Sequence, residues 1–196
     1  KRKLPGGDTP APVRKGHPCE CASLALKREC KVKFETNRLV IRHPRVEDAA
    51  DIFRNYAQDG EVTKYLTWRP HRELKETQRW IQYCIENANT NHSLMFVLQF
   101  KETSEAIGMI DFRLEGYKAH CGFVLARHYW NQGLMTEAMQ PLIEFLYESP
   151  NIYRLWAAHD IENEASGRVM LKLGMRCEGV MSGTLMYPNI SNEPRD

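Results

Sequence analysis

Apolar residues recur along this chain with two periods, one of two residues that is typical of strands and one of 3.6 that is typical of helices. The shorter period and short apolar runs predict strands at residues 36–42, 94–101, 106–114, 120–126, 154–159 and 176–185. The longer period predicts helices at residues 44–57, 73–87, 132–147 and 163–173. Gly60 and Gly174 lie just beyond two of these helices, where a glycine often ends a helix.

The order of these elements, β-α-α-β-β-β-α-β-α-β, predicts an α+β fold. Three successive strands between residues 94 and 126 are joined by short turns, which is typical of an antiparallel meander. The strand, helix and strand between residues 120 and 159 imply a parallel pair with a right-handed crossover. We therefore expect a central, mostly antiparallel sheet with one parallel pair and about four helices packed on both faces.

The first 33 residues differ from the rest of the 196-residue chain in charge and composition. They hold nine Lys or Arg against three Asp or Glu, and four of the ten prolines, whereas residues 34–196 carry a net charge of −4. We expect a basic N-terminal extension at residues 1–33 and one domain at residues 34–196. The extension has no aromatic residue before Phe34 to stack on bases, so nucleic acid is not the expected partner.

The cysteines and the apolar runs bear on compartment and metal binding. The chain has six cysteines, Cys19, Cys21, Cys30, Cys84, Cys121 and Cys177. The last three stand alone in apolar surroundings, which is typical of buried, reduced thiols in a cytoplasmic protein. The first three lie near His17, but Cys-x-Cys without a matching pair does not predict a metal site. No apolar run reaches the ~20 residues of a membrane span, and no signal-peptide core follows the basic start.

Two segments carry candidate chemistry. The strand at residues 120–126 leads through a loop with Gly133 directly into a helix, whose first N–H groups can cradle a phosphate. This loop is neither a P-loop nor a dinucleotide fingerprint. Asn163 is a good N-cap, and Ser166 lies three residues later, so their polar groups face the same way on the first turn. Ordinary helix capping explains the second segment equally well.

Together, the segments Tyr129–Ala138 and Asn163–Met175, the latter followed by Glu178-Gly179, resemble motifs of the GNAT N-acetyltransferase superfamily. The opening segment Glu35–Arg42 is similar to the usual first strand of its RimJ/RimL-like branch. The resemblance covers residues 34–196 and implies a GNAT-like fold whose parallel strand pair is splayed. It also implies transfer of an acetyl group from acetyl-CoA to a primary amine, on a protein N-terminus or a small molecule, by direct attack in a ternary complex.

The resemblance implies that acetyl-CoA contacts three segments: a strand for the pantetheine arm, a loop for the pyrophosphate, and a helix start near the sulfur. The residues concerned are Phe123, Val124, Leu125, Asn131, Gln132, Gly133, Leu134, Met135, Thr136, Asn163, Ser166 and Arg168. Met135 replaces a small residue of the family, and we expect it to crowd the pyrophosphate. The family continues into a final strand beyond the point where this chain ends, so we expect that strand to be absent here.

Amine acetylation needs a proton acceptor, because an ammonium has no lone pair, and a donor for the departing thiolate. His120 occupies the position where the branch often carries a glutamate, and its ordinary pKa near ~6.5 suits a base. A half-buried structural histidine is equally compatible with this position. His159 is a second candidate, Asp111 and Glu137 are weaker ones, and the resemblance nominates Ser166 as the acid.

Other functions stay open at this stage. A GNAT-like domain could bind CoA without turnover, and the basic tail could recruit nucleic acid, which salt-dependent binding would reveal. Homodimers are common in the family, so a homodimer is an alternative to a monomer. Tyr65, Trp68 and Tyr187 are candidate lining residues for the acceptor.

Overall fold

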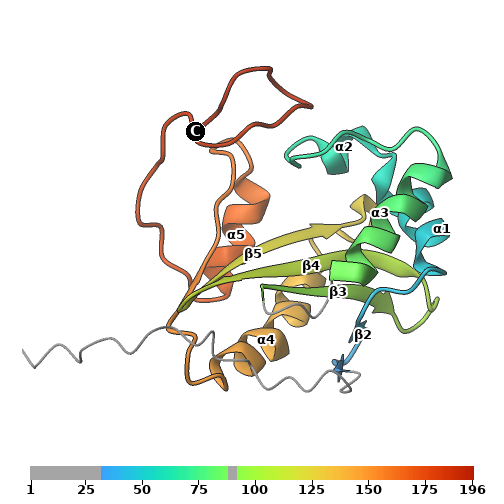
Figure 1. The fold of residues 1–196 in the computed structure, drawn as a ribbon, viewed down its shortest axis with the longest axis horizontal. Helices are drawn as coiled ribbons and strands as arrows, with labels where there is room; N and C mark the ends of the chain where they lie inside the picture. The colour runs from blue at the N-terminus through green and yellow to red at the C-terminus, as the bar shows by residue number, and fades with distance from the viewer. Residues whose placement is uncertain (1–31, 88–91) are drawn as a thin grey trace, which may run out of the picture.

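The computed structural model describes residues 32–87 and 92–196, and it confirms the expected α+β architecture (Figure 1). Six strands form one sheet in sequence order, and every neighbouring pair is antiparallel except β5 and β6. The strands are β1 (Lys33–Glu35), β2 (Leu39–Arg42), β3 (Ser93–Phe100), β4 (Ala106–Glu115), β5 (Lys118–Leu125) and β6 (Arg154–Trp156). The predicted meander is therefore β3, β4 and β5, and the predicted parallel pair is β5 and β6.

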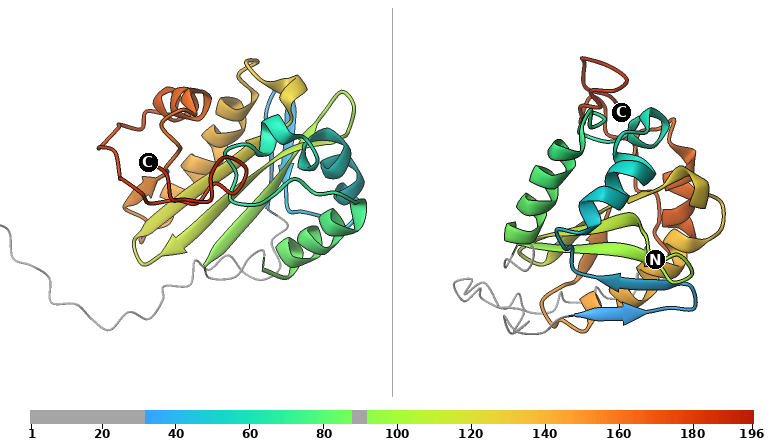
Figure 2. Two further views of the ribbon diagram at one scale, coloured as in Figure 1. Left: turned by 90° about the horizontal axis from the view of Figure 1, so that it is seen from above. Right: turned by 90° about the vertical axis from the view of Figure 1, so that its right-hand side faces the viewer.

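Helices cover both faces of this sheet (Figure 2). They are α1 (Asp48–Ile52), α2 (Gly60–Thr63), α3 (Leu74–Asn87), α4 (Leu134–Tyr147) and α5 (Glu164–Lys172), with a π-helical turn at Phe53–Ala57 and a 3-10 turn at Arg127–Tyr129. Ile110 and Phe112 of β4 pack in the core that includes α4, while Met109 packs in the second core with α1 and α3. The alternation of β4 thus supplies two cores, one on each face of the sheet.

The helix predicted at residues 44–57 ends at Ala57 as expected, with a π-helical last turn, but it starts four residues later than expected, at Asp48. Arg42 forms an ion pair with the buried Asp48 at 2.6 Å, and Asp48 also accepts a hydrogen bond from the Arg45 N–H at 2.7 Å. This turn delays the start of α1 to Asp48. Gly60 lies beyond this helix, as expected, and it also begins the short helix α2, which Asp59 caps by accepting from the Glu61 N–H.

The strand predicted at residues 36–42 is observed as β2 and covers only Leu39–Arg42. Its partner β1 was not predicted from the sequence. β1 pairs with β2 across a tight turn in which the Thr36 N–H donates to the Leu39 carbonyl at 2.9 Å. The Thr36 hydroxyl in turn accepts from the Leu39 N–H at 3.0 Å. These bonds make residues 36–38 a turn, so the strand begins only at Leu39.

The strand predicted at residues 176–185 is wrong. This segment forms no ladder and makes only an isolated bridge, between Leu185 and Arg195. A strand needs a hydrogen-bonded neighbour and a buried face, but Val180 is 67% exposed and Gly183 has a φ of 59°. Cys177 is exposed on this segment, against expectation, whereas Cys84 and Cys121 are buried as expected.

The C-terminal segment instead packs back across the molecule. Asn189 donates to the carbonyls of Thr63 and Trp68 at 2.7 and 2.8 Å, which ties the segment to the α2 region. Arg195 forms an ion pair with the buried Asp160 at 2.6 Å, beyond the end of β6. Tertiary contacts therefore hold this segment without strand pairing.

Three sequence expectations concern membrane and metal binding. Across residues 32–87 and 92–196, no helix is long and apolar enough to cross a bilayer. The same ranges contain no group of three metal-ligating side chains. The basic extension with His17, Cys19, Cys21 and Cys30 lies almost entirely outside the described residues.

Candidate active site

Strands β5 and β6 pair over only three residues and then separate (Figure 1). We call the place where they separate the fork, and it is the centre of the candidate site. They pair only from Lys118 and Arg154 to His120 and Trp156, although β5 continues to Leu125. The second half of β5 is therefore paired on one edge alone. A splayed parallel pair is what the resemblance implied.

The backbone of β5 turns unpaired groups toward the fork. The Ala126 N–H donates to the Ile107 carbonyl on the β4 side, and the Tyr153 N–H donates to the Tyr117 carbonyl on the β6 side. Because every second residue of a ladder faces the same edge, Phe123 and Leu125 direct their N–H and C=O groups into the fork. The Trp130 indole donates to the Leu125 carbonyl at 2.7 Å, which leaves the Phe123 groups and the Leu125 N–H for a ligand.

Helix α4 starts without a side-chain cap, and this start lies at the end of the loop that follows β5. Its N-cap residue, Gly133, has a φ of 76°, a left-handed conformation that favours glycine. The first intrahelical bond runs from the Glu137 N–H to the Gly133 carbonyl at 3.0 Å. The N–H groups of Leu134, Met135 and Thr136 precede that bond, so they have no intrahelical acceptor and can bind an anion.

Met135 does not crowd this helix start. Its side chain is only 4% exposed and packs in the core beneath α4, next to the equally buried Leu134. A residue at the second position of a helix can point inward while its N–H points along the axis toward a ligand. The expected clash is therefore wrong, and Leu134 and Met135 offer only backbone groups to the site.

The loop before α4 is held by its own polar groups. Asn131 has a φ of 60°, and the exposed Gln132 side chain donates to the His128 carbonyl at 2.9 Å. The Gln132 carbonyl accepts from the Arg38 guanidinium at 3.0 Å. The side chain of Gln132 thus braces the loop.

His120 lies where the fork opens, on the sheet face opposite α4. Its ring contacts Trp156 edge to face at 4.5 Å, and its Nδ1 is buried without a hydrogen-bond partner among the described residues. Burial lowers the pKa of His120 and the Arg113 charge adds to this, while the Asp111 carboxylate opposes it. The ring is therefore neutral at pH 7, as a general base must be.

The other candidate bases have other contacts. Glu137 accepts from the Thr36 hydroxyl at 2.6 Å and forms an ion pair with Arg38 at 2.7 Å, so its carboxylate is fully engaged. Asp111 pairs with Arg113 at 3.1 Å and lies over Gly122, where a Cβ would come within 2.5 Å of its Oδ1. Both carboxylates stabilise the scaffold around the site.

His159, the second candidate base, contacts Asp160 and α5. Its Nδ1 is 2.8 Å from the carbonyl oxygen of Asp160. Its Nε2 would be 3.0 Å from a Cβ at Gly167, so the ring packs against α5 where that helix carries a glycine. The structure brings His120 to Trp156 and His159 to α5.

Helix α5 begins with the capping that the sequence predicted. Asn163 accepts from the Ser166 N–H at 3.3 Å, and Gly174 follows the helix with a φ of 81°. The half-buried Ser166 hydroxyl makes no hydrogen bond within the described ranges. Arg168 is exposed and pairs with Glu164 at 3.1 Å along the helix surface.

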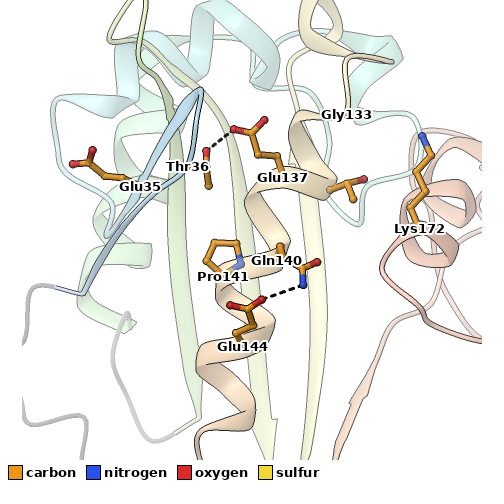
Figure 3. A pocket seen from close by; sticks show the side chains of 9 residues that line it. Glu35, Thr36, Gly133, Glu137, Gln140, Pro141, Glu144 and Lys172 are labelled. Carbon is orange, nitrogen blue, oxygen red and sulfur yellow. Dashed lines mark hydrogen bonds between the residues drawn. The ribbon is translucent and has the colours of Figure 1, made fainter.

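A pocket of about 630 Å³ lies on the outer flank of α4, beside this site (Figure 3). It touches the helix start at Gly133 and Thr136 and then follows α4 between the β1 turn and Lys172 of α5. Three carboxylates line it, Glu35, Glu137 and Glu144. Because such walls repel an anion, we place the candidate active site at the fork and the start of α4.

Sequence reasoning missed Arg38, Thr36, Trp130 and Trp156, which shape the fork and the loop. Arg38 and Thr36 stand in the opening motif, for which the sequence predicts only the role of a first strand. Trp130 lies within the loop motif itself, but its indole bond to a strand carbonyl has no sequence signal.

Comparison with known proteins gives the family of this chain. The acetyltransferase (GNAT) domain family matches residues 38–176. An uncharacterized N-acetyltransferase of Bacillus licheniformis, p20, is 32% identical over 149 residues, which is 74% of this chain and 83% of the relative. The ribosomal protein uS5-alanine N-acetyltransferase of Escherichia coli is 26% identical over 165 residues, 80% of this chain and 84% of the relative.

The fold agrees with this assignment. The crystal structure of the microcin C7 self-immunity acetyltransferase in complex with acetyl-CoA and AMP has a TM-score of 0.73 to this chain at 18% identity. The match covers 80% of this chain and 89% of that protein. The family match over most of the domain, together with the forked sheet, shows that this chain is an enzyme of the GNAT acetyltransferase family, related to the ribosomal-protein N-acetyltransferases.

Proposed function

We propose that this enzyme transfers the acetyl group of acetyl-CoA to the α-amine of a protein N-terminus, or to a small primary amine, within a ternary complex. The observation that carries the proposal is the pairing of two unsatisfied backbone surfaces, the fork edge of β5 and the uncapped start of α4. Acetyl-CoA has matching chemistry, since its pantetheine arm carries amides and its diphosphate is anionic.

The residues present fit this cofactor. Phe123 and Leu125 would hydrogen-bond the amide arm as a strand would, filling the edge that β6 leaves open. The N–H groups of Leu134, Met135 and Thr136 would hold the diphosphate, with the favourable end of the α4 dipole behind them. The microcin acetyltransferase, which shares the fold, has been crystallised with acetyl-CoA.

His120 is proposed to remove the proton from the acceptor ammonium. The amine nitrogen then forms a bond to the acetyl carbon, and the carbon–sulfur bond breaks. The CoA thiolate takes up a proton, and the nitrogen loses its second proton, which restores the group that protonated the thiolate. The buried, unpartnered Nδ1 at the mouth of the fork supports this role, because a purely structural histidine usually satisfies a buried nitrogen. Ser166 is proposed to donate the proton to the thiolate, since its hydroxyl has no competing bond within the described ranges.

The acceptor is proposed to enter on the His120 face, where α2 and the C-terminal segment meet. Tyr65 and Tyr187 contact edge to face there at 6.5 Å, and the Tyr65 hydroxyl donates to the Glu162 carbonyl at 3.4 Å. One relative is named as a ribosomal protein uS5-alanine N-acetyltransferase, and since alanine has no side-chain amine, this name supports an N-terminal α-amine as the acceptor.

Titration with acetyl-CoA and CoA, followed by thiol release with peptides that carry free α-amines, tests the proposal. The pKa of His120 is lowered from 6.5, so kcat/KM should fall as the pH drops through a value below 6.5. We expect His120→Gln to reduce kcat/KM by about 100-fold and to remove this acid limb. His92→Gln, at an exposed histidine beside β3, is the matched control.

Either of two results would contradict this reading. An unchanged acid limb in His120→Gln would exclude His120 as the base. Binding of acetyl-CoA without turnover of any amine would favour the CoA-binding module instead of the transferase.

A further inference from the structure

One ionic network joins the beginning of the domain to the loop before α4. The Arg38 guanidinium donates to the Glu137 carboxylate through Nε at 2.8 Å and through an Nη at 2.7 Å. The Arg38 backbone N–H and the Thr36 hydroxyl bind the other carboxylate oxygen at 2.8 and 2.6 Å. Figure 3 shows the Thr36 bond and the position of Glu137 on the first turn of α4.

The same guanidinium also reaches the loop. An Nη of Arg38 donates to the carbonyl oxygen of Gln132 at 3.0 Å. In a trans peptide the C=O and the following N–H point in opposite directions. The bond to Gln132 therefore directs the Gly133 N–H away from Arg38 and fixes the peptide that leads into α4.

The local sequence does not fix the orientation of the peptide between Gln132 and Gly133. Gly133, which follows this peptide, has a φ of 76°, and Asn131, which precedes Gln132, has a φ of 60°. Glycine adopts positive and negative φ almost equally well. The local sequence thus permits both orientations of the peptide between Gln132 and Gly133. Arg38, more than 90 residues earlier in the chain, selects one of them.

Arg38 also controls the charge beside the helix start. Partial burial of Glu137 opposes ionisation, but the bonds from Thr36 and Arg38 outweigh it and lower the pKa of the carboxyl. Glu137 is therefore ionised at neutral pH, one turn from the N–H groups of α4. Without the guanidinium this carboxylate would stand uncompensated beside an anionic ligand and weaken its binding.

We propose that Arg38 is a positioning residue for the diphosphate of acetyl-CoA, acting through the Gln132 carbonyl and through neutralisation of Glu137. This inference rests on the proposed function. It assigns Arg38 no contact with the reacting atoms, because its Nε and one Nη already bind the Glu137 carboxylate and the Gln132 carbonyl. It predicts a defect that depends on whether the acetyl donor carries a diphosphate.

The test compares acetyl-CoA with S-acetylpantetheine, which has the thioester and the amide arm but no phosphate. For Arg38→Ala we expect the Kd and KM of acetyl-CoA to rise about tenfold, the scale of one lost charge-assisted hydrogen bond. We expect kcat/KM with S-acetylpantetheine to equal that of the wild type. Arg54→Ala is the matched control, because Arg54 is an exposed arginine paired with Asp51 and Glu105.

Two more variants separate the effect of Arg38 on the Gln132 carbonyl from its neutralisation of Glu137. They also provide a test that does not depend on the folding of Arg38→Ala. The double variant R38A/E137Q should recover part of the acetyl-CoA affinity, because it removes the uncompensated carboxylate but not the loop defect. Arg38→Lys keeps the charge but lacks the planar guanidinium. It should therefore fold even if Arg38→Ala fails to fold, and it should still lose acetyl-CoA affinity. Thermal melting of each variant checks the fold.

The outcomes are distinct. Equal losses with acetyl-CoA and S-acetylpantetheine, or no loss with either, would overturn the positioning role while leaving the proposed function intact. If the folded wild-type enzyme bound no acetyl-CoA, the proposed function and this inference would both fall.

Discussion

Helices α4 and α5 begin in opposite ways, although each follows a strand of the same parallel pair. At α5 the Asn163 side chain accepts from the Ser166 N–H, so the first turn satisfies part of its own hydrogen-bonding need. At α4 the N-cap is Gly133, which has no side chain to offer, and the first three N–H groups have no intrahelical acceptor. The start of α5 has a side-chain cap from the protein itself, whereas the start of α4 has none and can be capped by an anion.

The difference shows how two similar helix starts serve different purposes. A capped start stabilises the fold at no cost to function, while an uncapped start keeps its dipole available to a ligand. The residues around the two helix starts differ in the same way. Arg38, from a distant turn, braces the start of α4 through Glu137 and the Gln132 carbonyl, whereas the cap of α5 comes from its own N-cap residue.

Giving α4 a charged cap should have the largest effect. We expect Gly133→Asp to weaken acetyl-CoA binding about 100-fold, because its carboxylate would cap the N–H groups and repel the diphosphate at close range. Gly133→Asn is the matched control, since asparagine has the same shape, tolerates a positive φ and carries no charge. Calorimetric titration with acetyl-CoA measures the affinity of both variants. Equal affinities would mean that no anion binds at this helix start.

Removing the hydroxyl from the first turn of α5 should have an intermediate effect. We expect Ser166→Ala to lower kcat/KM by about 10-fold to 100-fold if the hydroxyl protonates the thiolate, with the melting temperature unchanged. Ser166→Thr keeps a hydroxyl and should retain most of the activity. Steady-state kinetics at saturating amine measures both. If Ser166→Ala had wild-type rates, Ser166 would not be the proton donor, and the start of α5 would have a structural role only.

Removing the cap of α5 should have the smallest effect on binding. We expect Asn163→Ala to reduce the free energy of unfolding by about 1 kcal/mol, as the loss of a good N-cap does. Asn163→Asp keeps the acceptor oxygen and should keep the stability. Urea denaturation measures the change, and titration measures acetyl-CoA affinity alongside. A loss of affinity as large as that of Gly133→Asp would erase the distinction between the two helices.

Sequence periodicity predicted the regular elements that bury an apolar face. Strands β3, β4 and β5 and helices α3, α4 and α5 all lie within a few residues of their predicted limits. Periodicity failed where side-chain contacts decide the backbone. The bond from the Arg45 N–H to Asp48 makes the start of the predicted helix at residues 44–57 a turn. Residues 176–185 have no neighbouring strand to pair with.

The candidate site was predictable where one short segment carries it. The loop with Gly133, the cap at Asn163 and the position of His120 all follow from local motifs. The contact between Arg38 and Gln132 joins residues 94 positions apart, so no local pattern could reveal it. The inward direction of Met135 also depends on how α4 packs on the sheet.

By itself, the sequence determined the strands β3 to β5, the helices α3 to α5 and the helix start at Gly133, because periodicity and capping act over a few residues. The tertiary structure alone decided that β5 and β6 separate after His120 and that Arg38 braces a loop far along the chain. It also decided that the segment from Arg176 to Leu185 stays unpaired. These features depend on which surfaces meet when the sheet is assembled, and packing of distant elements sets that outcome.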